Sequence, residues 1–174
     1  NHSSAASDVY KRQDVSGNTD NCSIDVTVND VTNPTAVCQD VTVQLDSTGN
    51  GTITTTDVDN GSNDVCGIDS ISVAPTAYTC ANLGANVATL DVVDLSGNSS
   101  NCTATITVQD NMAPVALCQD ITIQLDAGGN ATISTSQIDN GSADNCSIAG
   151  YSASPNTFNC GNIGTNAVTL DITD

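Results

Sequence analysis

The chain has 174 residues, with 20 acidic and only two basic side chains, and its formal net charge is −18. Such a charge argues against nucleic acid and anionic membrane surfaces as partners, because phosphate groups bind basic surfaces. Every acidic residue is Asp, and no Lys, Arg or His occurs after residue 13. The chain therefore lacks the usual partners of acid–base and nucleophilic catalysis, and we expect no enzyme.

The sequence repeats with a period of 80 residues. The stretch 34–94 aligns with 114–174 without a gap, and 31 of 61 positions are identical. The cysteines recur with the same period: Cys22 recurs as Cys102, and Cys38, Cys66 and Cys80 recur as Cys118, Cys146 and Cys160. A fixed period with fixed cysteines predicts tandem copies of one folding unit.

In chain order, residues 1–13 match no part of the repeat, hold the only Lys, Arg and His, and are set apart as a leader of non-native appearance. Residues 14–33 correspond to the last strand of a preceding repeat, 34–113 to a complete repeat, and 114–174 to a second repeat without its last strand. This frame fits a segment of a longer array, which we favour, or subunits that exchange a strand. Both interpretations predict copies joined end to end in a filament.

The complete repeat predicts about seven short strands separated by turns. Alternating apolar residues indicate half-buried strands, and in chain order these fall at 41–45, around Ile53 and Thr55, in a hairpin through 66–80 that turns near Ala74-Pro75, at 88–92 and at 102–108. This pattern is typical of all-β proteins, and we expect tandem immunoglobulin-like β-sandwiches. No apolar run approaches the length of a membrane span.

Four cysteines per repeat, without a CxxC pair or nearby His, favour disulfides over zinc and indicate an oxidising, extracellular location. Four cysteines allow three pairings. We favour Cys66–Cys80, with Cys146–Cys160 as its equivalent, because the predicted hairpin brings these residues together. We also favour Cys38–Cys102, since the first and last strands of such a sandwich begin at the same end. Cys22 and Cys118 would then pair with a neighbouring copy.

The segment from Gly84 to Val108 resembles the signature of hyalin (HYR) repeats, through Asp94, Gly97, Asn98 and Cys102. The runs 62–67 and 142–147 resemble the D-N-C-G element of that family, although Val65 replaces its Asn, and Gln follows Cys38 where the family often has Pro. The resemblance covers 14–174, and the Lys-free, Asn/Thr/Asp-rich composition resembles that of long surface proteins of Bacteroidota. It implies an immunoglobulin-like fold and a role in extracellular adhesion.

The junction between repeats is a candidate calcium site, because Ca²⁺ prefers six to eight oxygen ligands. Asp110-Asn111 resembles the calcium-binding linkers of cadherins. The candidate ligands are Asp110, Asn111, Asp46, Asp30, Asp57, Asp59 and Asp64. The alternative is that these residues are ordinary turn formers.

Covalent glycans are a second candidate feature. Acceptor motifs N-x-[ST] occur at Asn50, Asn130, Asn60, Asn140, Asn21, Asn101, Asn98 and Asn145, and the surroundings of Ser70 resemble a bacterial O-glycosylation motif. The Asn motifs recur in register, which duplication of the repeat also explains, and a solvated Ser/Thr-rich face is the alternative.

Taken together, these patterns predict a structural or adhesive segment of an extracellular filament or surface stalk, stapled by disulfides and coated with glycan. The alternative is a carbohydrate- or protein-binding module of a secreted protein, with the 57–64 and 94–101 loops as its contact surface. Binding loops should differ between copies, yet the sequence DNGS recurs unchanged at 59–62 and 139–142, which favours the structural role.

Overall fold

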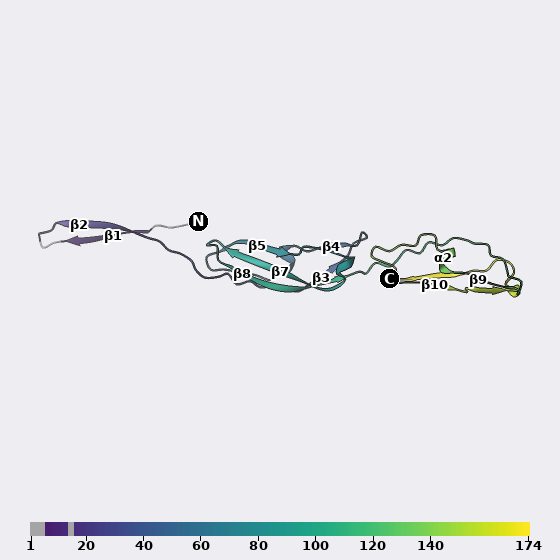
Figure 1. The fold of residues 1–174 in the computed structure, drawn as a ribbon. Coiled ribbons are helices and arrows are strands. Elements are labelled where there is room, and N and C mark those ends of the chain that lie inside the picture. The colour runs from purple at the N-terminus through teal and green to yellow at the C-terminus, as the bar shows by residue number, and fades with distance from the viewer. Residues whose placement is uncertain (1–5, 14–15) are drawn as a thin grey trace. The chain divides into compact units, whose positions relative to one another are not determined.

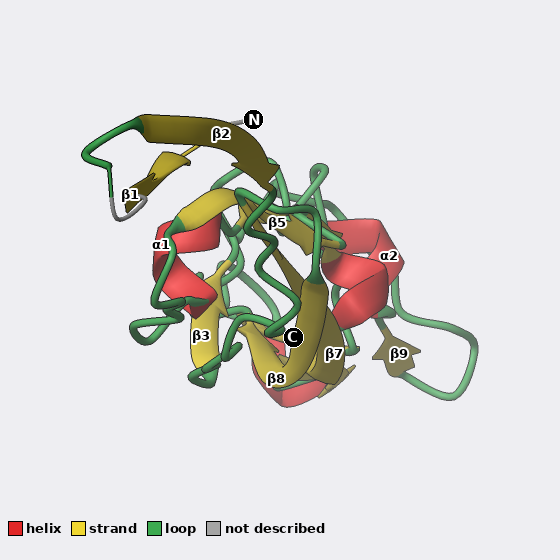
Figure 2. Ribbon diagram, turned by 90° about the vertical axis from the view of Figure 1, so that its left-hand side faces the viewer, coloured by secondary structure: helices red, strands yellow, loops and turns green. Residues whose placement is uncertain are grey.

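A computed structural model describes residues 6–13 and 16–174, and most of its regular structure is β-strand, as predicted (Figure 1). Every helical segment of the described residues is short (Figure 2). The strands are β1 (Ala6–Gln13), β2 (Thr19–Val26), β3 (Val41–Gln44), β4 (Asn50–Thr52), β5 (Ile68–Ala74), β6 (Ala77–Thr79), β7 (Gly84–Asp94), β8 (Ser99–Gln109), β9 (Asn130–Thr132), β10 (Gly150–Ser154), β11 (Thr157–Asn159) and β12 (Thr169–Thr173). The helices are α1 (Thr55–Val58) and α2 (Thr135–Ile138), with 3-10 turns η1 (Cys80–Asn82) and η2 (Cys160–Asn162).

The chain divides into two compact units. The first contains Asn1–Val41, Ile53–Thr76 and Val87–Thr105, and the second contains Thr42–Thr52, Ala77–Asn86 and Ile106–Asp174. The largest sheet has four strands in the order β3-β8-β7-β5, and the other sheets have two strands each. The fold is therefore all-β with small sheets, and the immunoglobulin-like sandwich stays a prediction, as do the domain boundaries.

The predicted alternation of buried and exposed residues is confirmed on the two longest strands. On β7, Ala88, Leu90 and Val92 are all fully buried. On β8, Ala104, Ile106 and Val108 are at most 3 % exposed, and the residues between them face outward or are half-buried. Because side chains alternate across a strand, these positions place one face of each strand in the core.

The predicted strand through Ile53 and Thr55 is wrong at its second half, since Thr55 begins helix α1. The cause is a local capping box. The Asp57 carboxylate accepts a hydrogen bond from the backbone N–H of Thr54 at 2.7 Å, which satisfies a donor that a helix start leaves unpaired. Ser134 and Gln137 form the same box at the start of α2.

The predicted hairpin from Cys66 to Cys80 is also wrong. The chain does turn at the cis peptide between Ala74 and Pro75. However, β5 pairs with β7 and β6 pairs with β4, so the two arms enter different sheets. The turn residues were recognised, but sequence alone could not show which strand each arm would pair with.

The leader, which the sequence analysis sets apart from the fold, contributes a strand. The backbone of β1 pairs antiparallel with β2 along its length, from Ala6 opposite Val26 to Gln13 opposite Thr19. Strand β2 itself lies within the predicted 14–33 strand and is exposed at every residue. It has β1 as its one neighbour in a two-stranded sheet.

Many local elements recur 80 residues apart. Helices α1 and α2, turns η1 and η2, and the cis peptides before Pro75 and Pro155 are such pairs. So are the isolated bridges Cys38–Asp59 and Cys118–Asp139. A smaller core packs Ile133, Ile138, Phe158 and Leu170 together in the second unit. Residues with the same register number therefore have comparable backbone settings, which allows them to be compared below.

Candidate functional site

The disulfide between Cys38 and Cys102 forms as predicted, with the two Cα atoms 5.9 Å apart. Cys102 lies on β8, and Cys38 lies just before β3, the neighbour of β8 in the four-stranded sheet. A bridge across 64 residues contributes about 4 kcal/mol to stability in the chain-entropy model. Such a contribution matters here because the core contains few large side chains.

The second disulfide joins Cys80 to Cys146, with Cα atoms 5.3 Å apart. The predicted pairs Cys66–Cys80 and Cys146–Cys160 are therefore wrong, because each cysteine forms only one disulfide. The cause is the strand pairing described above. Strand β6, which pairs with β4, leads into Cys80 in the second unit, where Cys146 also lies. In sequence terms this bridge connects one 80-residue period to the next.

The Cys80–Cys146 disulfide is packed against a buried glycine. A Cβ atom on Gly49 would lie 2.6 Å from the Cys80 Sγ and 2.8 Å from the Asn145 carbonyl oxygen, and its φ of +73° is one that other residues rarely adopt. Gly49 is therefore the residue that fits both the turn and the close approach.

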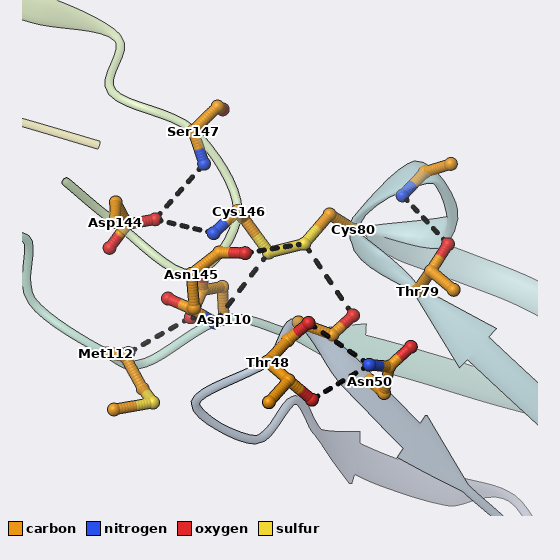
Figure 3. Close-up of a disulfide and its surroundings, with 12 residues drawn as sticks. Thr48, Asn50, Thr79, Cys80, Asp110, Met112, Asp144, Asn145, Cys146 and Ser147 are labelled. Carbon is orange, nitrogen blue, oxygen red and sulfur yellow. Dashed lines mark hydrogen bonds between the residues drawn. A yellow bond between two sulfur atoms is a disulfide. The ribbon is translucent and has the colours of Figure 1, made fainter.

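The side-chain amide of Asn145 forms hydrogen bonds beside the same disulfide (Figure 3). Its Nδ2 donates to the Asp46 carbonyl oxygen and to the Asp110 Oδ1, each at 3.1 Å. Asp46 and Asp110 belong to the first 80-residue period and Asn145 to the second, and all three lie in the second unit. The disulfide and these hydrogen bonds therefore form one junction between consecutive periods, which we call the Cys80–Cys146 junction.

An acidic cluster adjoins this junction. The carboxylate ligand atoms of Asp110, Asp144 and Asp174 lie within 4.8 Å of one another. The Asp144 Oδ2 accepts hydrogen bonds from the backbone N–H groups of Cys146 and Ser147, whereas the buried Asp144 Oδ1 and Asn145 Oδ1 have no hydrogen-bond partner. A hard cation such as Ca²⁺ would coordinate these buried oxygens, which accept no hydrogen bond, together with the carboxylates beside them.

A second acidic cluster shares two register positions with the first but has a thiol in place of the third carboxylate. Asp30, Asp64 and Cys66 lie within the same distance of one another, and Asp30 and Asp64 are the register equivalents of Asp110 and Asp144. Hydrogen bonds from Thr32 lower the pKa of Asp30. A hydrogen bond and the negative charge of Asp30 raise the pKa of the Cys66 thiol.

Two members of the first cluster, Asp144 and Asp174, were not among the ligands predicted from the sequence. Asp94 is the register equivalent of Asp174 but belongs to neither cluster. Asp94 is only 1 % exposed. Burial raises its pKa, but hydrogen bonds from Asn98 and from the backbone N–H of Ser96 outweigh this effect and leave the pKa below its usual value. The signal was present in the sequence, because Asp14, Asp94 and Asp174 recur in register.

The other predicted metal ligands lie outside both clusters. Asp46 accepts hydrogen bonds from Thr48 within its own turn, and Asp57 caps α1. Asp59 accepts one from the backbone N–H of Ser62, and Asn111 donates to the Gln44 Oε1. The hydrogen bonds lower the pKa of each of these three carboxylates. Their contacts are those of ordinary turn and cap residues.

The candidate glycan acceptors fall into two groups. Asn21, Asn50, Asn60, Asn101, Asn130, Asn140 and Ser70 are exposed, whereas Asn98 and Asn145 are partly buried. The amides of Asn98 and Asn145 also donate hydrogen bonds, to Asp94 and Asp110 respectively. Because a glycosylated amide must be accessible, the exposed group stays a set of candidate acceptors and these two become poor ones.

Four cysteines form no disulfide within the described residues: Cys22, Cys66, Cys118 and Cys160, all exposed. Within the same residues, no helix combines the length and the apolar composition needed to cross a membrane. No family model matches the chain, and no curated protein or solved structure was found to be similar to it.

Proposed function

We propose that this chain is a structural segment of an extracellular filament or surface stalk, built from disulfide-stapled tandem repeats. The observation that carries the proposal is the Cys80–Cys146 disulfide, which joins residues of two consecutive 80-residue periods. In a load-bearing array it prevents neighbouring repeats from separating under tension.

Three further observations support the extracellular setting. Two disulfides are compatible with an oxidising compartment. The all-β architecture and the resemblance to hyalin repeats fit immunoglobulin-like sandwiches of surface proteins. The charge of −18 keeps a long, exposed array soluble.

Within this proposal, Ca²⁺ would bind beside the Cys80–Cys146 junction, with Asp110, Asp144 and Asp174 as its carboxylate ligands. The support is the pair of buried oxygens without donors described above. Binding there would neutralise repulsion between three carboxylates and further stiffen the connection between periods. Glycans on the exposed Asn residues would coat the filament.

The mechanical role can be tested by stretching single oxidised chains held at both ends. With both disulfides intact, tension between Cys38 and Cys146 extends only the 80–102 stretch. A Cys80→Ser/Cys146→Ser variant extends the longer 102–146 stretch instead, so its unfolded contour should be about 75 Å longer. The matched Cys66→Ser/Cys160→Ser variant should extend like the parent chain. Equal contour lengths for all three chains would contradict the proposal.

A further inference from the structure

The Cys80–Cys146 junction contains a disulfide and, on the same loop, two of the oxygen ligands assigned to a cation. This loop, 144–147, carries the Asp144 carboxylate two residues before Cys146, which is bonded to Cys80. Asp110, the ligand facing it, also lies within the stretch of chain that the disulfide closes. A change at the two sulfur atoms therefore reaches the ligands through a short stretch of backbone.

Hydrogen bonds hold one oxygen of each of these carboxylates in place. The Asp144 Oδ2 accepts a hydrogen bond from the backbone N–H of Cys146 at 2.8 Å. The Asp110 Oδ1 accepts one from the backbone N–H of Met112 and one from the Asn145 Nδ2, each at 3.1 Å (Figure 3). Because two of these donors belong to loop 144–147, the relative position of the two carboxylates depends on where that loop lies.

The oxygens beside the disulfide lack a positive partner within the repeats. Asp144 Oδ1 and Asn145 Oδ1 are buried and accept no hydrogen bond, and no Lys, Arg or His occurs after residue 13. Carboxylate and amide oxygens form the donor set of Ca²⁺ and similar hard cations. The coupling proposed next rests on this calcium site, which is part of the proposed function.

Gly49 leaves the Cys80 sulfur little room to move. The Cys80 Sγ lies 3.7 Å from the Gly49 carbonyl oxygen and 3.5 Å from the Asn145 carbonyl oxygen. A Cβ atom on Gly49 would already come within 2.6 Å of this sulfur. When the disulfide is reduced, the two sulfur atoms repel each other at bonding distance and have to separate. Since Gly49 blocks Cys80, we expect the separation to displace Cys146 and with it loop 144–147.

We propose that the Cys80–Cys146 disulfide controls the affinity of the adjoining site for Ca²⁺, so that the oxidised chain binds the cation tightly and the reduced chain binds it weakly. Coupling between two equilibria is reciprocal, so bound Ca²⁺ makes the disulfide harder to reduce by the same factor. We expect a factor of about ten, within the range usual for coupled sites. For a two-electron couple this factor corresponds to about 30 mV in reduction potential.

The redox step is an exchange with small thiols. Two thiol groups of the reductant supply two electrons and two protons, so that Cys80 and Cys146 become thiols and the reductant becomes a disulfide. Glutathione is one such reductant, and dithiothreitol, which closes to a cyclic disulfide, is another. Both cysteines are only partly buried, which leaves the bond open to attack by a small thiolate.

This coupling would join two kinds of connection between consecutive periods. Under oxidising conditions with Ca²⁺ present, the covalent bond and the bound cation stabilise each other at the Cys80–Cys146 junction. Under reducing conditions, loss of the disulfide also weakens cation binding, so both connections are lost together. The junction would therefore be rigid outside the cell and loosen wherever small thiols accumulate.

The first period supplies a natural comparison for the ligand loop. The backbone N–H of Cys66 donates to the Asp64 Oδ2 at 2.7 Å, as that of Cys146 does to the Asp144 Oδ2. Between them stands Val65, where the second period has Asn145. A valine is thus compatible with this loop conformation, and Asn145→Val removes the amide oxygen while leaving the loop able to form.

The test is a redox titration of the oxidised chain in dithiothreitol buffers of graded potential, with excess Ca²⁺ or with a chelator. Alkylation of the thiols and peptide mapping then give the fraction of each disulfide. We expect Ca²⁺ to lower the reduction potential of Cys80–Cys146 by about 30 mV. The potential of Cys38–Cys102, whose cysteines lie outside the acidic cluster, should not change.

Single substitutions locate the effect. Asp144→Asn and Asn145→Val should each abolish the shift caused by Ca²⁺, whereas Asp64→Asn, at the equivalent position of the first period, should preserve it. Calorimetric titration with Ca²⁺ measures the reverse direction of the coupling. The Cys80→Ser/Cys146→Ser variant should bind Ca²⁺ about ten times more weakly than the parent chain.

Equal shifts of both disulfides would overturn the proposal, because they would indicate general stabilisation of the folded chain. So would an unchanged potential of Cys80–Cys146 in a chain that binds Ca²⁺, or a shift that survives Asp144→Asn. Failure to bind Ca²⁺ would remove the calcium site together with the coupling. None of these results bears on the covalent bridge itself, so the stretching experiment decides the mechanical role separately.

Discussion

Cys80 and Cys146 are bonded although 66 residues separate them, and each belongs to a different 80-residue period. Their nearest cysteines in sequence, Cys66 and Cys160, form no disulfide. The chain thus uses one bridge within the first period, at Cys38 and Cys102, and another between periods.

Loss of the bridge between periods should destabilise the chain. In the chain-entropy model a 66-residue loop contributes about 4 kcal/mol to the free energy of unfolding, so Cys80→Ser/Cys146→Ser should lower it by an amount of that order. Denaturant unfolding of the oxidised monomer measures the change. The matched Cys66→Ser/Cys160→Ser variant should lie within about 0.5 kcal/mol of the parent chain. A comparable loss in both variants would show that the bridge has no special role.

Gly49 should tolerate no side chain. Gly49→Ala places a methyl group against the Cys80 Sγ and the Asn145 carbonyl oxygen at a positive φ, and we expect a loss of about 3 kcal/mol from overpacking and backbone strain together. Gly61→Ala is the control, because Gly61 also has a positive φ but nothing within 4 Å of the added Cβ. Its cost should be about 1 kcal/mol, from strain alone. Equal costs would mean that the contact with Cys80 is unimportant.

Calcium should raise the melting temperature through the cluster at the Cys80–Cys146 junction. A ligand that binds only the folded state stabilises it by about 2.7 kcal/mol at one hundred times its Kd. Asp144→Asn should abolish the calcium-dependent shift, and Asp171→Asn, an exposed strand residue outside both clusters, should leave it intact. Calorimetry with and without a chelator measures the effect. A shift that survives Asp144→Asn would place the cation elsewhere.

The chain should lose stability in acid. The pKa values of Asp30, Asp46, Asp57, Asp59 and Asp139 are lowered in the folded state by hydrogen bonds, chiefly from Ser and Thr hydroxyls. Their contribution is complete above the ordinary pKa of 3.8 and is lost as the pH falls through the lower folded values. We therefore expect the melting temperature to be level at neutral pH and to fall below about pH 4.

A single variant checks the origin of this acid effect. Thr48→Val removes the hydroxyl that donates to the Asp46 carboxylate, so the fall in melting temperature between pH 4 and pH 2 should become smaller. The variant should also be less stable than the parent at neutral pH. An unchanged pH dependence would show that the Asp46 hydrogen bonds make no contribution to it.

Much of the fold follows from local sequence signals. The alternation of buried and exposed residues on β7 and β8 could be predicted from a hydrophobic period of two residues alone. The Cys38–Cys102 pair could be predicted from the positions of the first and last strands. Helix α1 was missed because its one-turn capping box, between Thr54 and Asp57, is too short to show a helical period. Its signal was a Thr three residues before an Asp, a common pattern in loops.

The pairing of Cys80 with Cys146 could not be predicted because it depends on non-local strand partners. The 66–80 segment reads as a hairpin, and nothing within it shows that β6 pairs with β4 while β5 pairs with β7. The acidic clusters could not be predicted for the same reason, since Asp110, Asp144 and Asp174 are 30 or more residues apart in the sequence. Their recurrence in register was visible, but their approach to one another was not.

The most direct test of the account is a disulfide map of the oxidised chain. A protease that cleaves before Asp separates Cys66, on peptide 64–68, from Cys80, on peptide 69–90, and leaves Cys146 and Cys160 together on peptide 144–170. The account predicts that peptides 69–90 and 144–170 are joined. A bond between 64–68 and 69–90, with an internal Cys146–Cys160 bridge in 144–170, would contradict the connection between periods and the filament proposed from it.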